Sequence, residues 1–260
     1  MKTISLLGCG WLGIPLAEAL LQRGFDVNGS TTSAGKIPLL ERKGIRPFLV
    51  TLDTDGVEGE IDRFLDADVL VIDIPPRFHF SKKIESLLPY IEQSTVKKVL
   101  LVSATSVYGQ ADGLIDEATE PVILSEKSAQ LLGAENHLRN QPGFDTTVVR
   151  LGGLIGPDRH PIFHLAGQSD LENPEAPVNL IHLQDCIGIL CKILETDAWG
   201  ETFNAVAPYH PTREQYYTQK AAERHLPPPQ FSHAQPSAGK TITATKVQRQ
   251  LDYRFEFPEL

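Results

Sequence analysis

Three glycines near the start of the chain have the spacing of a loop that binds a dinucleotide. Residues 8–13 read Gly-Cys-Gly-Trp-Leu-Gly. In such a loop the first glycine permits a tight turn, the second lets the backbone approach a pyrophosphate, and the third lets a strand and a helix pack closely. The residues that we expect to bind the cofactor here are Gly8, Gly10, Trp11, Leu12 and Gly13. The alternative is a plain glycine-rich turn.

The residues on either side of this loop favour the first interpretation. An apolar run at residues 4–7 is typical of a strand, and apolar positions over residues 16–21 have helical spacing that stops at Gly24. Strand, glycine loop and helix therefore occur in the order that the motif requires. The N–H groups of the first helical turn would face the phosphates of a bound dinucleotide.

The end of the second expected strand bears on the choice of cofactor. A site selective for NAD carries an acidic residue about 20 positions after the first glycine, where it binds the ribose 2′-hydroxyl. Residues 27–32 contain no carboxylate, and Asp26 opens the strand and is expected to point away. The groups that could instead donate to a 2′-phosphate are Ser30, Thr31, Thr32 and Lys36. The sequence thus slightly favours NADP over NAD; the alternative is a loop that is merely polar.

Asp53 follows the third expected strand and has two interpretations. It either contacts the adenine amino group or caps a turn.

The elements that must hold these residues alternate along the first part of the chain. Strands are expected at residues 25–30, 46–52, 67–74, 96–103 and 146–151. Helices are expected at 81–92 and 125–138, and residues 37–42 are expected as part of a helix that ends near Gly44. The nearly continuous apolar run at 67–74 is typical of a strand buried on both faces, and an acidic, proline-containing loop is expected at 112–121. We therefore predict an α/β fold, a Rossmann-like doubly wound parallel sheet over residues 1–155.

The remaining part of the chain, residues 156–260, has a different pattern. Short apolar runs occur at 178–181 and 201–204, helices are expected at 185–194 and 213–224, and an irregular loop at 226–239. We interpret this part as a small interleaved substrate-binding lobe.

The composition excludes several classes of function. The chain has 260 residues, 41% hydrophobic and 22% charged, which fits one large domain or one with a small added lobe. A net charge of -9 argues against nucleic acid as a partner. No apolar segment is long enough to cross a membrane, and three cysteines without a paired spacing are typical of reduced thiols. We expect a cytoplasmic protein with a small-molecule substrate.

Several further segments carry a family resemblance. They are Val-Ser-Ala-Thr-Ser-Val-Tyr-Gly at 102–109, the acidic pair at 116–117, the segment from Arg150 to Pro157, and Asn-Leu-Ile-His at 179–182 followed by Asp185. Together with the glycine loop they resemble the extended short-chain dehydrogenase/reductases, the NAD-dependent epimerase/dehydratase-like superfamily. The likeness spans nearly the whole chain. It is greatest to a short bacterial subgroup that also has a counterpart of Asp-Arg-His-Pro at 158–161.

The resemblance implies a cofactor wall and an activity. Ile74, Pro75 and Pro76 would lie against the adenosine and its ribose, although a loop terminator has the same pattern. The activity would be that of an oxidoreductase or epimerase acting on a sugar-like or small carbonyl substrate. Relatives often form a homodimer through helices equivalent to residues 81–92 and 125–138.

The chain departs from the family where the chemistry is expected. Aligning on residues 134–135 places Lys127 at the position of the family's tyrosine and Leu131 at that of its lysine. The family's partner hydroxyl sits four residues before the tyrosine of Val-Tyr-Gly, which is Ala104 here. We therefore expect the Tyr-x-x-x-Lys pair to be missing from the chain. The groups left to handle a proton are Thr105, Ser103 and Lys127, with Ser103 also against the cofactor. Lys127 is alternatively a solvated helix residue.

Two functions thus stay open. One is the enzyme, and the other is a non-catalytic dinucleotide-binding or redox-sensing protein. No metal is expected, because Pro157 and Pro161 prevent His160 and His164 from sharing a helix face.

Overall fold

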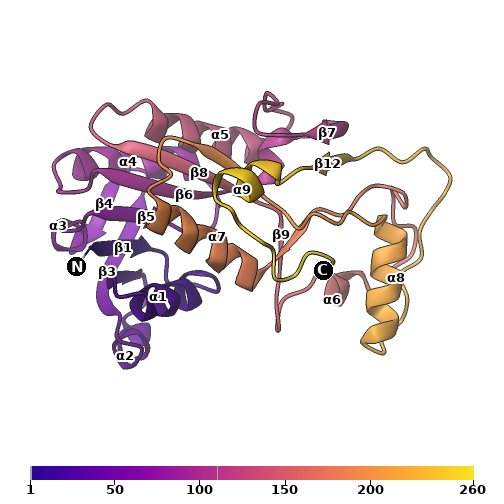
Figure 1. Ribbon diagram of the computed structural model, residues 1–260, viewed down its shortest axis with the longest axis horizontal. Coiled ribbons are helices and arrows are strands. Elements are labelled where there is room, and N and C mark those ends of the chain that lie inside the picture. Colours follow the sequence, from indigo (N-terminus) through magenta and orange to yellow (C-terminus); the bar gives the residue numbers. More distant parts are fainter. Residues whose placement is uncertain (1, 110) are drawn as a thin grey trace.

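A sheet of eight strands forms the centre of the computed structural model, which describes residues 2–109 and 111–260 (Figure 1). Its strands are β1 (Thr3–Leu7), β2 (Asp26–Thr31), β3 (Arg46–Asp53), β4 (Gly56–Gly59), β5 (Val69–Ile72), β6 (Lys98–Ala104), β8 (Asp145–Leu151) and β11 (Thr202–Ala205). Their order is β11-β8-β6-β5-β1-β2-β3-β4. All neighbours pair in parallel except β4, which runs antiparallel to β3 at the edge.

The order of the strands reverses between β1 and β5. Ile4 pairs with Val27 of β2 on one side and with Val69 of β5 on the other, and the chain then proceeds outward in both directions. In open parallel sheets a ligand binds in the crevice outside the carboxyl ends of the strands at this switch point. The loops that begin at Gly8 and Asp73 form that crevice here.

Helices cover both faces of the sheet. They are α1 (Gly13–Gln22), α2 (Ile37–Arg42), α3 (Ile61–Phe64), α4 (Phe80–Glu92), α5 (Glu126–Arg139), α7 (Leu183–Thr196) and α9 (Thr245–Gln250), with short 3-10 turns at Ala34–Lys36 and Thr105–Tyr108. Apolar residues of α1 and α7 share one core cluster with the sheet, whereas those of α3, α4 and α5 share a second cluster on the opposite face. The spacing of Ile84, Leu87, Leu88 and Ile91 explains α4, because all four are buried on one side of that helix.

A smaller lobe lies beyond one end of the sheet (Figure 1). It contains α6 (Ile162–Leu165) and α8 (Arg213–Glu223), which share a third core cluster that includes Ile162 and Tyr216. Two pairs of short parallel strands stand beside the main sheet: β9 (Gly153–Ile155) with β10 (Leu180–His182), and β7 (Gly113–Ile115) with β12 (Lys240–Ile242).

The chain leaves the sheet for this lobe and comes back. After residue 156 it builds the loop around α6, returns through β10, α7 and β11 to the main sheet, and then enters the lobe again with α8. The lobe that we expected over residues 156–260 therefore shares that part of the chain with the edge of the sheet.

The predicted fold class is confirmed: the chain is α/β, with a large, mostly parallel Rossmann-like sheet. The edge strand β4 and the short strand β7, within the loop expected at residues 112–121, were not predicted. Both are short and mostly solvent-exposed, so neither carries the apolar pattern that marks a strand in a sequence. Among the described residues no helix is long and apolar enough to cross a bilayer.

Candidate functional site

A groove runs along the carboxyl ends of β1 and β5. It consists of two adjoining cavities of about 510 and 430 Å³, both lined by Gly10, Asp73, Ile74 and Pro75. We call them the β2-side cavity, which reaches Ser30 and Lys36, and the β6-side cavity, which reaches Thr105 and Lys127.

The three glycines of the loop have three different surroundings. Gly8 has φ +114°, and a Cβ there would lie 2.2 Å from the carbonyl oxygen of Asp73. A Cβ on Gly13 would lie 2.1 Å from the carbonyl oxygen of Gly8. A Cβ on Gly10 would meet nothing within 4 Å, because this residue faces the open groove. Gly8 and Gly13 thus serve packing, and the absence of a side chain at Gly10 leaves the groove beside it open.

The start of α1 offers unpaired donors to that space. Among residues 2–109 and 111–260, the N–H groups of Trp11, Leu12 and Gly13 have no hydrogen-bond acceptor. No side chain caps α1, and its first turn contains no acid. A helix end with free N–H groups and the positive end of its dipole is suited to an anion.

The β2-side cavity contains the polar groups expected around the adenosine. Ser30, Thr31, Thr32 and Lys36 all line it. The Ser30 hydroxyl also accepts a hydrogen bond of 2.9 Å from the N–H of Gly8, so it holds the glycine loop in place. Thr31 is partly engaged with the backbone of Ser33, whose N–H lies 3.1 Å from the Thr31 hydroxyl.

Sequence reasoning missed two cations in this cavity. Arg77 and Lys83 line it beside Lys36, and Asp73 is its one acidic lining residue. Phe78 stands at the same wall with 89% of its surface exposed. These residues follow β5 in a loop and an amphipathic helix, where a sequence pattern gives no sign that they turn toward the groove.

Asp53 does not line either cavity. Its carboxylate accepts a hydrogen bond of 2.7 Å from the N–H of Thr54 and lies 4.0 Å from the ammonium of Lys83. This geometry matches the turn-capping alternative. Ile74 and Pro75 line both cavities, and Pro76 lines the β6-side cavity alone.

Trp11 connects the glycine loop to the second lobe. Its indole N–H donates to the Asp158 carboxylate over 2.8 Å, and the Arg159 guanidinium lies 5.0 Å above its ring. The ring also fills the space beside Gly156, where a Cβ would approach it to 2.7 Å. Trp11 and Arg159 both line the β6-side cavity, so this contact forms part of the groove wall.

The β6-side cavity brings together the three groups expected to handle a proton. Ser103, Thr105 and Lys127 all line it, beside Ala104 and Ser106. The Ser103 hydroxyl donates to Glu135 over 2.7 Å, away from the cavity. Lys127 is exposed in the first turn of α5, and Thr105 is buried at the end of β6.

A buried polar network lies behind this cavity. Glu135 of α5 forms a two-point ion pair with Arg150 of β8, at 3.1 and 2.6 Å. Arg150 donates to the Tyr108 hydroxyl, which donates in turn to Asn204, both over 2.9 Å. The arrangement explains the Val-Tyr-Gly segment and Arg150 as supports that fix the end of β6.

Asp73 is the residue of the groove that sequence reasoning missed most clearly. It belongs to the apolar run expected as a strand, but the strand ends at Ile72 and the carboxyl group lies in the wall of both cavities. Burial raises the pKa of Asp73 to about 8, although Arg159 opposes this shift. A shift of this size is typical of functional carboxyl groups.

The Tyr-x-x-x-Lys spacing does occur in the chain, so the expectation that it is missing is wrong. Tyr216 and Lys220 have it, but they lie on α8 of the second lobe and line neither cavity of the groove. The Tyr216 hydroxyl pairs with His160 over 2.9 Å, and burial raises the pKa of Tyr216. A phenol with a raised pKa is not an activated proton donor at neutral pH.

His160 has a structural role in this arrangement. Its Nδ1 accepts from the N–H of Ile162, so its Nε2 donates to Tyr216. Burial, Arg224 and Lys220 lower the pKa of His160 to about 4, which keeps the ring neutral.

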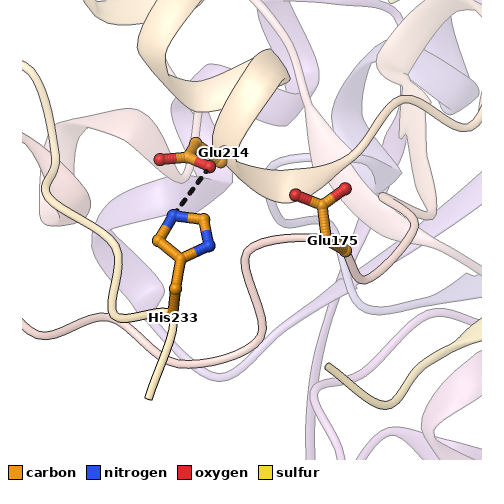
Figure 2. A group of neighbouring side chains, drawn as sticks. All are labelled: Glu175, Glu214 and His233. Carbon is orange, nitrogen blue, oxygen red and sulfur yellow. Dashed lines mark ion pairs between the residues drawn. The ribbon is translucent and has the colours of Figure 1, made fainter. Parts of the chain in front are cut away.

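One group among the described residues has the composition of a metal site. Glu175, Glu214 and His233 lie close together in the second lobe (Figure 2), and none of them lines either cavity of the groove. His233 pairs with Glu214 at 3.3 Å, and Figure 2 shows Glu175 to the side of this pair. An exposed ion pair accounts for the arrangement.

Over the residues that form the groove, the chain is similar to known NAD(P)H-binding proteins. The sequence pattern of the family described as NAD(P)H-binding matches residues 8–179, from the glycine loop to the start of β10. The chain belongs to this NAD(P)H-binding family. It is also 33% identical over 268 residues to Protein YeeZ of Escherichia coli K12, with 100% of this chain and 97% of YeeZ covered.

Solved structures show the same fold at lower identity. A functionally unknown conserved protein from Silicibacter pomeroyi has a TM-score of 0.84 at 21% identity, covering 100% of this chain and 95% of that one. UDP-glucuronic acid 4-epimerase from Bacillus cereus, solved with NAD, has a TM-score of 0.79 at 19% identity, covering 98% and 91%. The predicted family resemblance is confirmed by the NAD(P)H-binding family and by YeeZ, and these solved structures share the fold.

Proposed function

We propose that this chain is an NAD(P)-dependent oxidoreductase or epimerase that acts on a sugar-like or small carbonyl substrate. The observation that carries the proposal is the meeting of the two cavities at Gly10 and Asp73, which places the glycine loop midway along one groove. The adenosine half of a dinucleotide would occupy the β2-side cavity, and the pyrophosphate the free N–H groups of residues 11–13. The nicotinamide and the substrate would share the β6-side cavity.

The chain's own residues would position the substrate and move a proton, while the bound cofactor supplies or accepts the hydride. Of the three groups expected to handle a proton, Lys127 and Thr105 reach the β6-side cavity without the strong partner that Ser103 has in Glu135. A carbonyl oxygen placed between them would receive its proton from this pair. Ser103 would serve chiefly to hold the end of β6.

NADP is the cofactor that the charges favour. Three cations, Lys36, Arg77 and Lys83, line the β2-side cavity, so a 2′-phosphate would enter a positive field. This preference is tested by titrating the protein with NADPH and with NADH while tryptophan fluorescence is measured. We expect NADPH to bind about tenfold more tightly, a difference of about 1.4 kcal/mol.

The matched variants are Lys36→Ala and Lys82→Ala. Lys36→Ala should reduce the preference for NADPH, whereas Lys82, exposed on α4 and outside both cavities, should leave it unchanged. If NADH binds more tightly than NADPH, the cofactor is NAD and not NADP. Failure of both dinucleotides to bind would overturn the proposal.

The second candidate is a non-catalytic dinucleotide-binding or redox-sensing protein. The hydrogen bond from Ser103 to Glu135 favours it, because it removes one hydroxyl from the pool of proton donors. A screen of sugar-like and small carbonyl compounds separates the two: absorbance measures net NADPH oxidation by an oxidoreductase, and NMR of the compounds detects epimerisation, which consumes no net NADPH. Turnover of any compound supports the enzyme, and tight cofactor binding without turnover supports the second candidate.

A further inference from the structure

The carboxyl group of Asp73 lies where a pyrophosphate would approach the glycine loop. Its Oδ2 is 3.2 Å from the point that a Cβ on Gly13 would occupy, so it stands beside the first turn of α1. It lines both cavities where they meet. The free N–H groups of residues 11–13, which are the natural partners of phosphate oxygens, belong to the same turn.

An ionised carboxylate in this position would oppose a pyrophosphate. The two like charges would share a partly buried site, where their repulsion is stronger than in water. A carboxylic acid has the opposite effect, because its O–H can donate a hydrogen bond to a phosphate oxygen. The protonation state of Asp73 therefore decides whether it hinders or helps the ligand.

The groups around Asp73 give it little help in staying ionised. From the glycine loop it faces the Cys9 thiol, whose pKa burial and Asp73 raise to about 12. From α7 it faces Cys186, whose pKa burial raises well above its usual value. Arg159, from the second lobe, is the cation that acts on it.

That cation is shared with other groups. The Arg159 guanidinium lies over the Trp11 ring and is exposed to solvent, which screens its charge. Lys36 acts on Cys9, and Arg159 is the charge that acts on Asp73. With a pKa of about 8 the carboxyl group already holds its proton at neutral pH, and a neighbouring pyrophosphate would raise this pKa further.

We propose that Asp73 binds the pyrophosphate of the dinucleotide as a neutral carboxylic acid, donating its proton in a hydrogen bond to a phosphate oxygen, so that dinucleotide binding takes up a proton in alkaline solution. The proton comes from solvent and forms the carboxyl O–H; no covalent bond to the ligand is made. The inference rests on the proposed function, which places the pyrophosphate at this loop.

The test measures binding of NADH to the full chain between pH 6.5 and 9.5. NADH is the probe because it lacks the 2′-phosphate of NADPH, a group that itself titrates near pH 6. We expect a nearly constant Kd up to about pH 8 and then a rise approaching about tenfold per pH unit. Calorimetry at pH 9 in two buffers of different ionisation enthalpy should detect uptake of close to one proton, and almost none at pH 6.5.

Asp73→Asn is the informative variant, since its amide also donates a hydrogen bond and never ionises. It should bind NADH with a Kd that does not change with pH and without proton uptake. Asp66→Asn is the matched control, because Asp66 is exposed and lines neither cavity, and it should behave as the unaltered chain does.

Three results would overturn the inference. One is NADH binding whose Kd and proton count do not change with pH, which leaves the dinucleotide function intact. Another is proton uptake that persists in Asp73→Asn. The third is failure of both NADH and NADPH to bind at any pH, which overturns the proposed function as well. If Asp73→Asn does not fold, as judged by circular dichroism, the proton count of the unaltered chain decides.

Discussion

The glycines of the loop differ in the space that a side chain would have. Substitutions at the individual glycines can therefore distinguish an effect on ligand binding from an effect on folding. Gly10→Ala should fold normally, because its Cβ meets nothing within 4 Å. Gly10→Asp should also fold but weaken dinucleotide binding by about a hundredfold or more, since it puts bulk and negative charge against the phosphates. Fluorescence titration with NADPH measures this effect.

Gly13→Ala provides the contrast. Its Cβ would clash with backbone, so we expect a loss of about 2 kcal/mol or more in the free energy of unfolding without any ligand. Urea unfolding of the three variants gives that comparison. Unchanged NADPH affinity in Gly10→Asp would contradict the role given to the loop.

For Lys127 the structure is compatible with two roles, a proton donor and a solvated surface residue. It is exposed at the start of α5, yet it lines the β6-side cavity. If it delivers a proton, Lys127→Met should slow turnover by about tenfold or more while the affinity for NADPH stays the same. Steady-state kinetics on any substrate found by the carbonyl screen provides the measurement.

Lys82→Met is its matched control, because Lys82 is exposed on α4 and outside the groove. Equal rates in the two variants would assign Lys127 to the solvated surface.

At the scale of elements, one ion pair fixes α5 against the sheet. Glu135 is fully buried and its partner Arg150 is 4% exposed at the side chain. Glu135→Gln would leave the guanidinium charged without its partner, and removing one member of a buried pair costs about 3 kcal/mol. We therefore expect a clear fall in the free energy of unfolding, measured with urea.

The exposed end of the same helix supplies the control for this prediction. Glu126→Gln changes a carboxylate that is exposed and accepts only from Gln130, so the cost should be below about 0.5 kcal/mol. Equal losses in the two variants would show that the buried pair adds nothing to stability.

Most elements could be predicted because the physics that forms them is local. The spacing of apolar residues predicted α4 within one residue, and residues 37–42, expected as part of a helix that ends near Gly44, form α2. A short apolar run was noted at 201–204, but the place of β11 beside β8 at the edge of the main sheet was not predicted. Pairing partners depend on contacts between distant parts of the chain, which no local pattern contains.

At the scale of the whole molecule, the site could be predicted only in part. The glycine loop and the polar end of β2 were found, because their residue types have a direct chemical reason. Asp73 and Arg159 could not be found in the same way. Asp73 lies at the end of an apolar run, and Arg159 follows a turn that contains a proline. Only the tertiary fold brings both residues to the groove.

The chain enters the second lobe in two separate segments, and this limits how the lobe can move. A lobe joined by a single linker swings as a rigid body, with that linker as its hinge. Here residues 156–179 and 207–239 enter and leave separately, while between them β11 belongs to the main sheet and α7 packs against one of its faces. Several connecting segments would have to bend together for the lobe to move as a rigid body. We therefore expect access to the groove to depend on side chains in its wall, the Trp11 ring and Arg159, rather than on movement of a whole domain.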